Sequence, residues 1–198
     1  KKIQETYAVK LKDEKERLKS RSGGVFVAIS NEILKNNGSV FGAAFKKDFS
    51  VHHIMAENII ERDKCRGSKY IQSNLENTFK EAYEKLKENK KVLYTGTPCQ
   101  IQGLNSYLKL KNMKTDNLYT CDIVCHGVPS TKIYNDYINF FSEKYKSNVK
   151  NFDFRDKSFG WSDHVETIEF ESGKKISQEY LKNLFYSNYT LRPRCYEC

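Results

Sequence analysis

The feature that most constrains the fold is the stretch KVLYTGTPCQIQGLNSYL at residues 91–108. A short apolar run at residues 92–94 is typical of a buried strand, and apolar residues return at helical spacing from Ile101 onward. Between the two, Thr97 suits the N-cap of a helix and Pro98 its first position. The stretch therefore predicts a strand, a tight turn and a helix.

Cys99 lies in the first turn of this predicted helix, where unpaired backbone N–H groups and the positive end of the helix dipole favour a thiolate. It is a candidate metal ligand or nucleophile, and a buried structural cysteine is the alternative. A second turn follows the apolar run at residues 118–124 and contains Cys125, His126 and Gly127. Because parallel strands joined by a helix end at one edge of a sheet, we expect Cys99 and Cys125 to face one crevice.

Length and composition favour a single compact domain, since 198 residues that are 38% hydrophobic can bury a substantial core. No apolar run approaches the roughly 20 residues needed to cross a bilayer, and the N-terminus lacks the apolar region of a signal peptide. We therefore expect a cytoplasmic protein without a membrane partner. The net charge of +9 is spread along the chain, which favours an anionic ligand or an acidic partner protein over nucleic acid.

The six cysteines favour metal or redox roles over disulfides in a cytoplasmic chain. Cys195 and Cys198 form a Cys-x-x-Cys pair, a spacing that presents two sulfurs to one metal centre. Cys121 falls inside a predicted strand and is assigned to the core, while Cys65 is a weaker alternative ligand. Because a domain rarely ends on a metal ligand, we expect the sequence to be truncated at its C-terminus.

Two further segments combine residue types that bind anions. Ser22, Gly23 and Gly24 precede an amphipathic pattern that Asn36-Asn37-Gly38 closes, so they either cradle a phosphate at a helix start or form an ordinary cap. The segment RGSKY at residues 66–70 places two cations, a hydroxyl and an aromatic ring close together. It is a phosphate clamp or a solvated loop.

The rest of the chain completes a pattern of alternating strands and helices. Residues 1–19 form a charged lead-in or linker. Residues 40–45 and 51–56 predict an antiparallel hairpin, on which the adjacent His52 and His53 point to opposite faces and so cannot share a metal. Helices are predicted at residues 75–90 and 130–145, and strands at residues 149–154 and 165–171.

Seven short motifs occur in collinear order along the chain: SGGVF, FGAAF, RGSKYIQS, GTPCQIQGL, DIVCHGVPS, FRDKSFGW and RPRCYEC. Together they resemble the C-terminal domain of the coenzyme F420 hydrogenase/dehydrogenase beta-subunit family over residues 20–198. The resemblance implies a single α/β domain with a mixed β-sheet flanked by helices. It also implies an oxidoreductase in which FAD passes electrons between a [4Fe–4S] cluster and a hydride acceptor, either F420 or another small molecule.

The resemblance also implies site residues and partners. A four-iron cluster requires four thiolates, for which we assign Cys99, Cys125, Cys195 and Cys198, with zinc as the alternative metal. The residues assigned to the flavin site are Ser22, Gly23, Gly24, Arg66, Ser68, Lys69, Tyr70, Thr97 and Gln100. His126 is the candidate to relay a proton or to hydrogen-bond a cluster sulfur, and packing within its turn is the alternative. Expected partners are a ferredoxin or ferredoxin-like domain, a small-molecule hydride acceptor and a larger redox complex.

A second class of function remains open from the sequence. The chain could be a non-catalytic iron–sulfur or zinc-bearing subunit that serves as an electron relay or adaptor in a larger complex. Reduction of a substrate by the protein with dithionite or reduced ferredoxin as donor would separate the two classes. Binding to nucleic acid ranks last, because no alternation of basic and aromatic residues and no known motif supports it.

Overall fold

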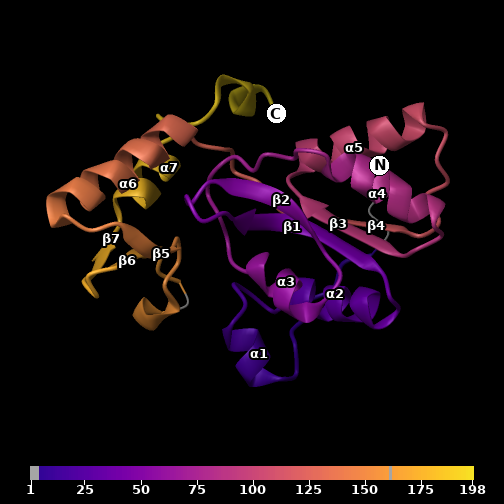
Figure 1. Ribbon diagram of the computed structural model, residues 1–198, viewed down its shortest axis with the longest axis horizontal. Helices are drawn as coiled ribbons and strands as arrows, with labels where there is room; N and C mark the ends of the chain where they lie inside the picture. Colours follow the sequence, from indigo (N-terminus) through magenta and orange to yellow (C-terminus); the bar gives the residue numbers. More distant parts are fainter. Residues whose placement is uncertain (1–4, 161) are drawn as a thin grey trace. The chain divides into compact units, whose positions relative to one another are not determined.

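The computed structural model describes residues 5–160 and 162–198 (Figure 1). Residues 1–4 of the lead-in and Trp161, the last residue of the FRDKSFGW motif, lie outside the described residues. The α/β architecture, with a mixed sheet flanked by helices, confirms the predicted fold class. Contacts divide the chain into two compact units. The first comprises Lys1–Gly42, His53–Arg66 and Glu76–Ile123, and the second comprises Ala43–His52, Gly67–Leu75 and Val124–Cys198.

The larger sheet contains four strands in the order β2-β1-β3-β4. Their bounds are Ser39–Phe45 for β1, Val51–Ala56 for β2, Val92–Gly96 for β3 and Leu118–Asp122 for β4. β1 and β2 are neighbours joined by a turn in which the Lys46 N–H donates to the Ser50 carbonyl at 2.8 Å, as the predicted hairpin requires. β1, β3 and β4 run parallel, and β3 and β4 end together with Gly96 beside Asp122.

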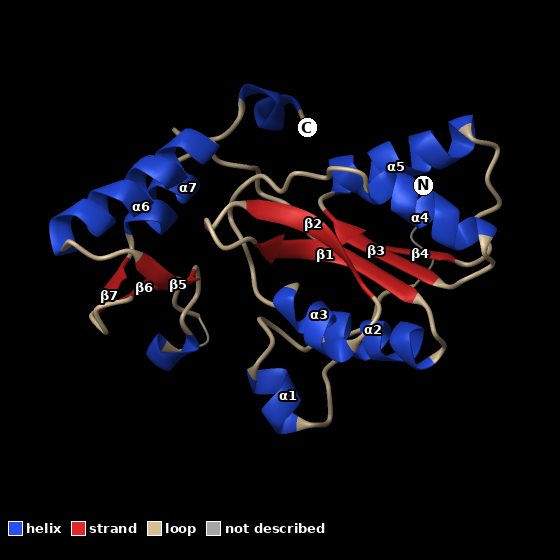
Figure 2. Ribbon diagram, viewed as in Figure 1, coloured by secondary structure: helices blue, strands red, loops and turns tan. Residues whose placement is uncertain are grey.

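Helices cover both faces of this sheet (Figure 2). The helices α4 (Thr78–Lys87) and α5 (Pro98–Leu110) pack on one face against Phe41 and Tyr94, whereas α2 (Val25–Lys35) packs on the other against Val40 and Leu93. Successive strand residues point to opposite faces, so both members of each adjacent pair are buried. α3 (Ile59–Lys64) lies beside α2.

The second unit contains its own antiparallel sheet, in the order β5-β6-β7. Its elements are α6 (Thr131–Tyr145), β5 (Val149–Asp153), β6 (Glu166–Phe170), β7 (Lys175–Gln178) and α7 (Tyr180–Tyr186). The first two strands and α6 confirm the predictions, whereas β7 was not predicted. The core of the unit is largely aromatic and includes Phe141, Phe152 and Phe170.

Three short helices complete the described structure: α1 (Glu14–Leu18), η1 (Lys157–Phe159) and η2 (Pro193–Glu197). The charged lead-in thus forms a single short helix within its described part. Across the described residues, no helix has both the length and the apolar character needed to cross a membrane.

Candidate functional site

The turn between β3 and α5 has the geometry predicted from the sequence. Thr97 is the N-cap and Pro98 the first helical residue, and Gln100 closes a capping box by accepting a hydrogen bond from the Thr97 N–H at 3.0 Å. Cys99 is exposed in this first turn, and a hydrogen bond of 3.1 Å joins its Sγ to Thr97 Oγ1. The alternative of a buried structural cysteine is wrong for Cys99. An exposed thiol at a helix N-terminus is suited to bind a metal or to act as a nucleophile.

A buried histidine, His53, lies on the edge strand β2 and contacts β3, the strand that leads into this turn. His53 is 3% exposed, its Nε2 lies 2.9 Å from the Thr95 carbonyl, and its ring stacks on Tyr94. Burial lowers the pKa of His53, so the imidazole is neutral near pH 7 and donates the Nε2–H to that carbonyl. His53 is therefore a core histidine.

Gly42 on β1 leaves room for neighbouring side chains to pack closely against the strand. A Cβ added at Gly42 would lie 3.0 Å from the Cβ of Cys65 and 3.1 Å from Thr95 Oγ1. The glycine therefore lets Cys65 pack directly against the strand. This contact explains why Cys65, the weaker alternative ligand, sits against the sheet and is only partly exposed.

The glycines expected to cradle a phosphate are covered by the chain itself. Gly24 is the N-cap of α2 with a φ of 82°, a left-handed conformation that favours glycine. The Gly23 carbonyl accepts a hydrogen bond of 2.7 Å from the Leu11 N–H, and a Cβ at Gly23 would lie 2.3 Å from the Val9 carbonyl oxygen. In this arrangement residues 9–11 occupy the space that a phosphate would need.

Arg66 is engaged by a carboxylate of the same unit. Its Nη1 lies 2.8 Å from Glu16 Oε2, and its Nη2 donates to the Glu16 carbonyl at 2.8 Å and to Ser20 Oγ at 3.2 Å. Hydrogen bonds from Lys19 and Arg66 lower the pKa of Glu16 to about 2. The Arg66 guanidinium therefore binds an anionic group, and a phosphate would have to displace Glu16 from it.

The remaining residues of the RGSKY segment that were assigned to the flavin belong to the second unit. Lys69 Nζ donates to the Gly67 carbonyl at 3.3 Å and lies 5.8 Å from the centre of the Phe45 ring. Tyr70 packs against Phe154 and Phe185, with ring centroids 5.6 and 5.3 Å away. Tyr70 thus contributes to the aromatic core of its unit.

The other three predicted ligands lie in the second unit, where two of their segments pair. Residues 128–130 run antiparallel to residues 190–192, and the Val128 N–H donates to Cys195 Sγ at 3.4 Å. The turn that follows Cys125 and the Cys195 segment are therefore neighbours. Cys125 and Cys198 are exposed and Cys195 is half-buried. His126 forms a hydrogen bond of 2.8 Å between its Nε2 and Asn188 Oδ1, and its ring contacts Phe185.

The donor set has the chemistry of an iron–sulfur site, and its members come from both units. Four cysteines are the thiolates that a [4Fe–4S] cluster takes. Cys99, however, belongs to the first unit and the others to the second. Across the described residues, no three histidine, cysteine, aspartate or glutamate side chains are grouped as a metal site would require. The structure thus contains candidate ligands and no preassembled metal centre in its described part.

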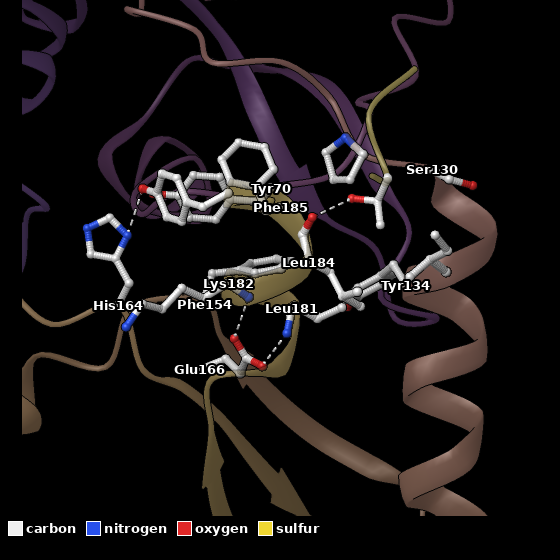
Figure 3. Close-up of a pocket in the computed structure, with 14 residues that line it drawn as sticks. Tyr70, Ser130, Tyr134, Phe154, His164, Glu166, Leu181, Lys182, Leu184 and Phe185 are labelled. Atoms are coloured by element: carbon white, nitrogen blue, oxygen red, sulfur yellow. Dashed lines mark hydrogen bonds between the residues drawn. The ribbon is translucent and has the colours of Figure 1, made fainter. Parts of the chain in front are cut away.

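A pocket in the second unit was not predicted from the sequence (Figure 3). Its walls come from the start of α6, from α7, from β6 and from Tyr70, and they include Glu166, which is 1% exposed. The carboxylate of Glu166 accepts hydrogen bonds from the Leu181 N–H at 2.8 Å and from the Tyr137 hydroxyl at 3.1 Å. One sequence signal could have found this residue: Glu166 shares the strand face of Ile168 and Phe170, both of which are buried.

Comparison with known proteins identifies the family. The family model described as the C terminus of the beta subunit of coenzyme F420 hydrogenase/dehydrogenase matches residues 89–198, which is more than half of the chain. The chain belongs to this family. No match was found among curated proteins.

Among solved structures, this family member is similar to a chain of the F420-reducing [NiFe] hydrogenase complex from Methanosarcina barkeri, determined in a xenon-derivatised form. The TM-score is 0.63 and the sequence identity is 18%, a likeness that establishes the fold. The match covers 97% of this chain and 66% of the hydrogenase chain, which is just under two thirds of the latter.

Proposed function

We propose that this chain is a module of a flavin- and iron–sulfur-dependent oxidoreductase that transfers electrons between a [4Fe–4S] cluster, FAD and a hydride acceptor. Membership of the F420 hydrogenase/dehydrogenase beta-subunit family carries the proposal. The exposed Cys99 in the first turn of α5 supports it, because an accessible cysteine can serve as a cluster ligand. Since the similar hydrogenase is F420-reducing, F420 is the first acceptor to test. The first donor to test is a ferredoxin, or a ferredoxin-like domain within a larger redox complex.

The proposed cluster ligands are Cys99, Cys125, Cys195 and Cys198. The proposal requires Cys99 of the first unit and the three cysteines of the second unit to bind one cluster. When bound, the cluster would supply single electrons and the flavin would pair them for hydride transfer. His126 is proposed to hydrogen-bond a sulfur or to relay a proton, in exchange for its contact with Asn188.

For the flavin, the proposed phosphate ligands are the cations Arg66 and Lys69, the Ser68 hydroxyl and the backbone at Ser22, Gly23 and Gly24. Tyr70 is proposed to stack on the flavin, and Thr97 and Gln100 to contact its ring system. Glu16 must release Arg66, and residues 9–11 must leave Gly23, before a phosphate can occupy the cradle. The cradle as described is therefore closed, and flavin binding would open it.

Anaerobic reconstitution tests the cluster. We expect four irons per chain in the wild type, the number in a [4Fe–4S] cluster, and their loss in Cys99→Ala and Cys125→Ala variants. Cys121→Ala is the matched control, because Cys121 lies within β4 and packs against the core beside α2. Full iron content in the Cys99→Ala and Cys125→Ala variants would exclude the assigned ligands. Iron binding without reduction of any hydride acceptor would instead favour the electron-relay or adaptor function, and zinc without visible absorption would favour a structural metal.

Flavin titration tests the cradle. A Glu16→Gln substitution removes the charge that competes for Arg66, so this variant should bind FAD more tightly than the wild type. A Lys69→Ala substitution should weaken binding. Equal FAD affinity in all three proteins would exclude the assigned phosphate ligands, and absence of binding to any of them would exclude a flavin from this chain.

A further inference from the structure

The backbone of Val128 connects two of the cysteine segments of the second unit. Its carbonyl accepts a hydrogen bond of 2.9 Å from the Arg192 N–H, and its N–H donates to Cys195 Sγ at 3.4 Å. The Cys195 N–H in turn donates to the Arg192 carbonyl at 2.8 Å. These hydrogen bonds enclose the turn from Arg192 to Cys195, so the Cys195 sulfur is held beside the Val128 backbone.

Contacts on either side of this turn hold the same two segments together. The Ser130 N–H donates to the Thr190 carbonyl at 2.8 Å, within the antiparallel pairing of these segments. Tyr196, which lies between the cysteines of the Cys-x-x-Cys pair, donates its hydroxyl to the Asn188 carbonyl. The turn that carries the first cysteine of the pair is therefore attached to its unit by several hydrogen bonds.

Gly127 allows Val128 to approach this turn closely. The φ angle of Gly127 is 149°, a conformation that residues with a side chain rarely adopt. A Cβ at this position would lie 2.9 Å from the Leu191 side chain. The glycine therefore lets the backbone at residues 127–128 lie against the C-terminal segment, where the Val128 N–H contacts the sulfur.

The donor to Cys195 is a backbone N–H, so the chain and not a side-chain rotamer determines its direction. Hydrogen bonds to the ligand sulfurs help to set the reduction potential of an iron–sulfur cluster. Reduction adds an electron, and hence negative charge, to the cluster. Because a hydrogen bond becomes stronger as its acceptor becomes charged, this donor favours the reduced state. Groups that orient a metal ligand from outside the coordination sphere also strengthen metal binding.

We propose that Val128 is a positioning residue whose N–H orients the Cys195 sulfur for metal binding and, in the assembled cluster, raises the reduction potential. The inference rests on the proposed function, in which Cys195 is a cluster ligand. It assigns a role to a residue whose apolar side chain gives no sign of one, because Val128 acts through its backbone. Donor and acceptor both belong to the second unit.

Replacement of the Val128 amide by an ester tests the donor. Incorporation of the α-hydroxy acid analogue of valine at this position removes the N–H and keeps the side chain. The same change at Ser130 is the matched control, because it removes the neighbouring hydrogen bond to Thr190 and leaves the sulfur contact in place. In reconstituted protein, the Val128 ester should lower the equilibrium constant for cluster reduction about tenfold, a shift of about 59 mV to more negative potential. The Ser130 ester should keep the wild-type potential.

Cadmium gives a second measurement that needs neither iron nor flavin and does not depend on the folding of a variant. The wild-type protein is titrated with a spin-active isotope of Cd²⁺ and followed by NMR of the backbone amides. Cadmium bound to Cys195 should show a scalar coupling to the Val128 amide proton, transmitted through the N–H···S hydrogen bond. A Cys195→Ala variant should lose this coupling.

The two measurements separate this inference from the proposed function. An unchanged reduction potential in the Val128 ester would overturn the inference and leave the cluster assignment intact. So would an equal shift in both esters, or wild-type protein in which cadmium shows no coupling to Val128, whether or not it binds. Coupling to cadmium in a protein that binds no iron would support the role of Val128 at Cys195 and exclude the proposed cluster.

Discussion

Glu166 is a carboxylate enclosed by the core of the second unit and bonded to the first backbone N–H groups of α7. Burial raises its pKa above the ordinary value of 4.5, although the hydrogen bonds from Leu181, Lys182 and Tyr137 oppose that shift. Burial and the neighbouring Glu166 also raise the pKa of Tyr137. The residue therefore joins α6, β6 and α7 through one side chain, and its charge is unfavourable there.

Replacing Glu166 tests this balance. Glu166→Ala leaves the Leu181 N–H and the Tyr137 hydroxyl without their acceptor, so it should lower the free energy of unfolding by about 2–3 kcal/mol. Glu166→Gln keeps an acceptor oxygen and should cost less. Urea denaturation of the three proteins measures both effects.

The pH dependence of the same variants has a definite sign. Because the pKa of Glu166 is higher in the folded state, the folded protein binds more protons, and its stability falls as pH rises from 4.5 through the raised pKa. The stability of the wild type relative to Glu166→Gln should therefore decrease over that range. A difference that stays constant with pH would show that Glu166 does not titrate in this way.

At the same scale, the sequence predicted the local turn that holds Cys99 but not the tertiary contacts of Gly23 and Arg66. The position of Cys99 depends on local turn chemistry, namely an N-cap, a proline and a capping glutamine, all readable within four residues. The state of Gly23 and Arg66 depends on residues 9–20, which return to cover them. Composition cannot reveal a tertiary contact of that kind.

Helix α5 begins with an N-cap, a proline and a capping glutamine, and it contains one residue of low helix propensity, Gly103. A Cβ built at Gly103 would meet only the Phe79 ring, at 3.4 Å, which is ordinary van der Waals contact. Glycine costs about 0.5–1 kcal/mol relative to alanine within a helix. Gly103→Ala should therefore raise the free energy of unfolding by about that amount, as measured in urea.

Gly38→Ala is the opposing control for this substitution. A Cβ there would lie 2.5 Å from the Lys91 carbonyl oxygen and 2.7 Å from the Ile33 side chain, so this variant should lose stability. If Gly103→Ala were also destabilising, the Phe79 ring would have to be unable to accept even one methyl group.

Helices and strands that have a clear hydrophobic periodicity, or a clear capping or turn residue at one end, were predicted correctly. The helix that Ser130 precedes and the strands β5 and β6 are of this kind. β7 was missed because its residues, KISQ, show no apolar alternation on their own and pair only through the turn that follows β6. The pairing, and not the intrinsic preference of its residues, makes this segment a strand.

At the scale of the whole molecule, the chain order conceals the division into units. Residues 43–52 and 67–75 belong with the C-terminal part of the chain, although they lie within the first half of the sequence. The apolar side chains of Val51 and Ile71 pack in the same aromatic core as residues of α6 and β5, which lie much further along the sequence. Periodicity identifies buried faces but not which buried faces meet, so the two units cannot be read from the sequence.

The net charge of +9 is also a property of the whole chain, and it predicts a response to salt. Like charges repel in the compact state, and salt screens them over about 8–10 Å at 0.1–0.15 M. Exposed ion pairs such as Lys132–Asp136 are screened too, but each contributes little to stability. The melting temperature at pH 7 should therefore rise between about 10 and about 200 mM NaCl.

Near pH 9.1, the isoelectric point, net repulsion is absent and the increase should vanish. A fall in melting temperature with salt at pH 7 would mean that attractive pairs outweigh the net charge.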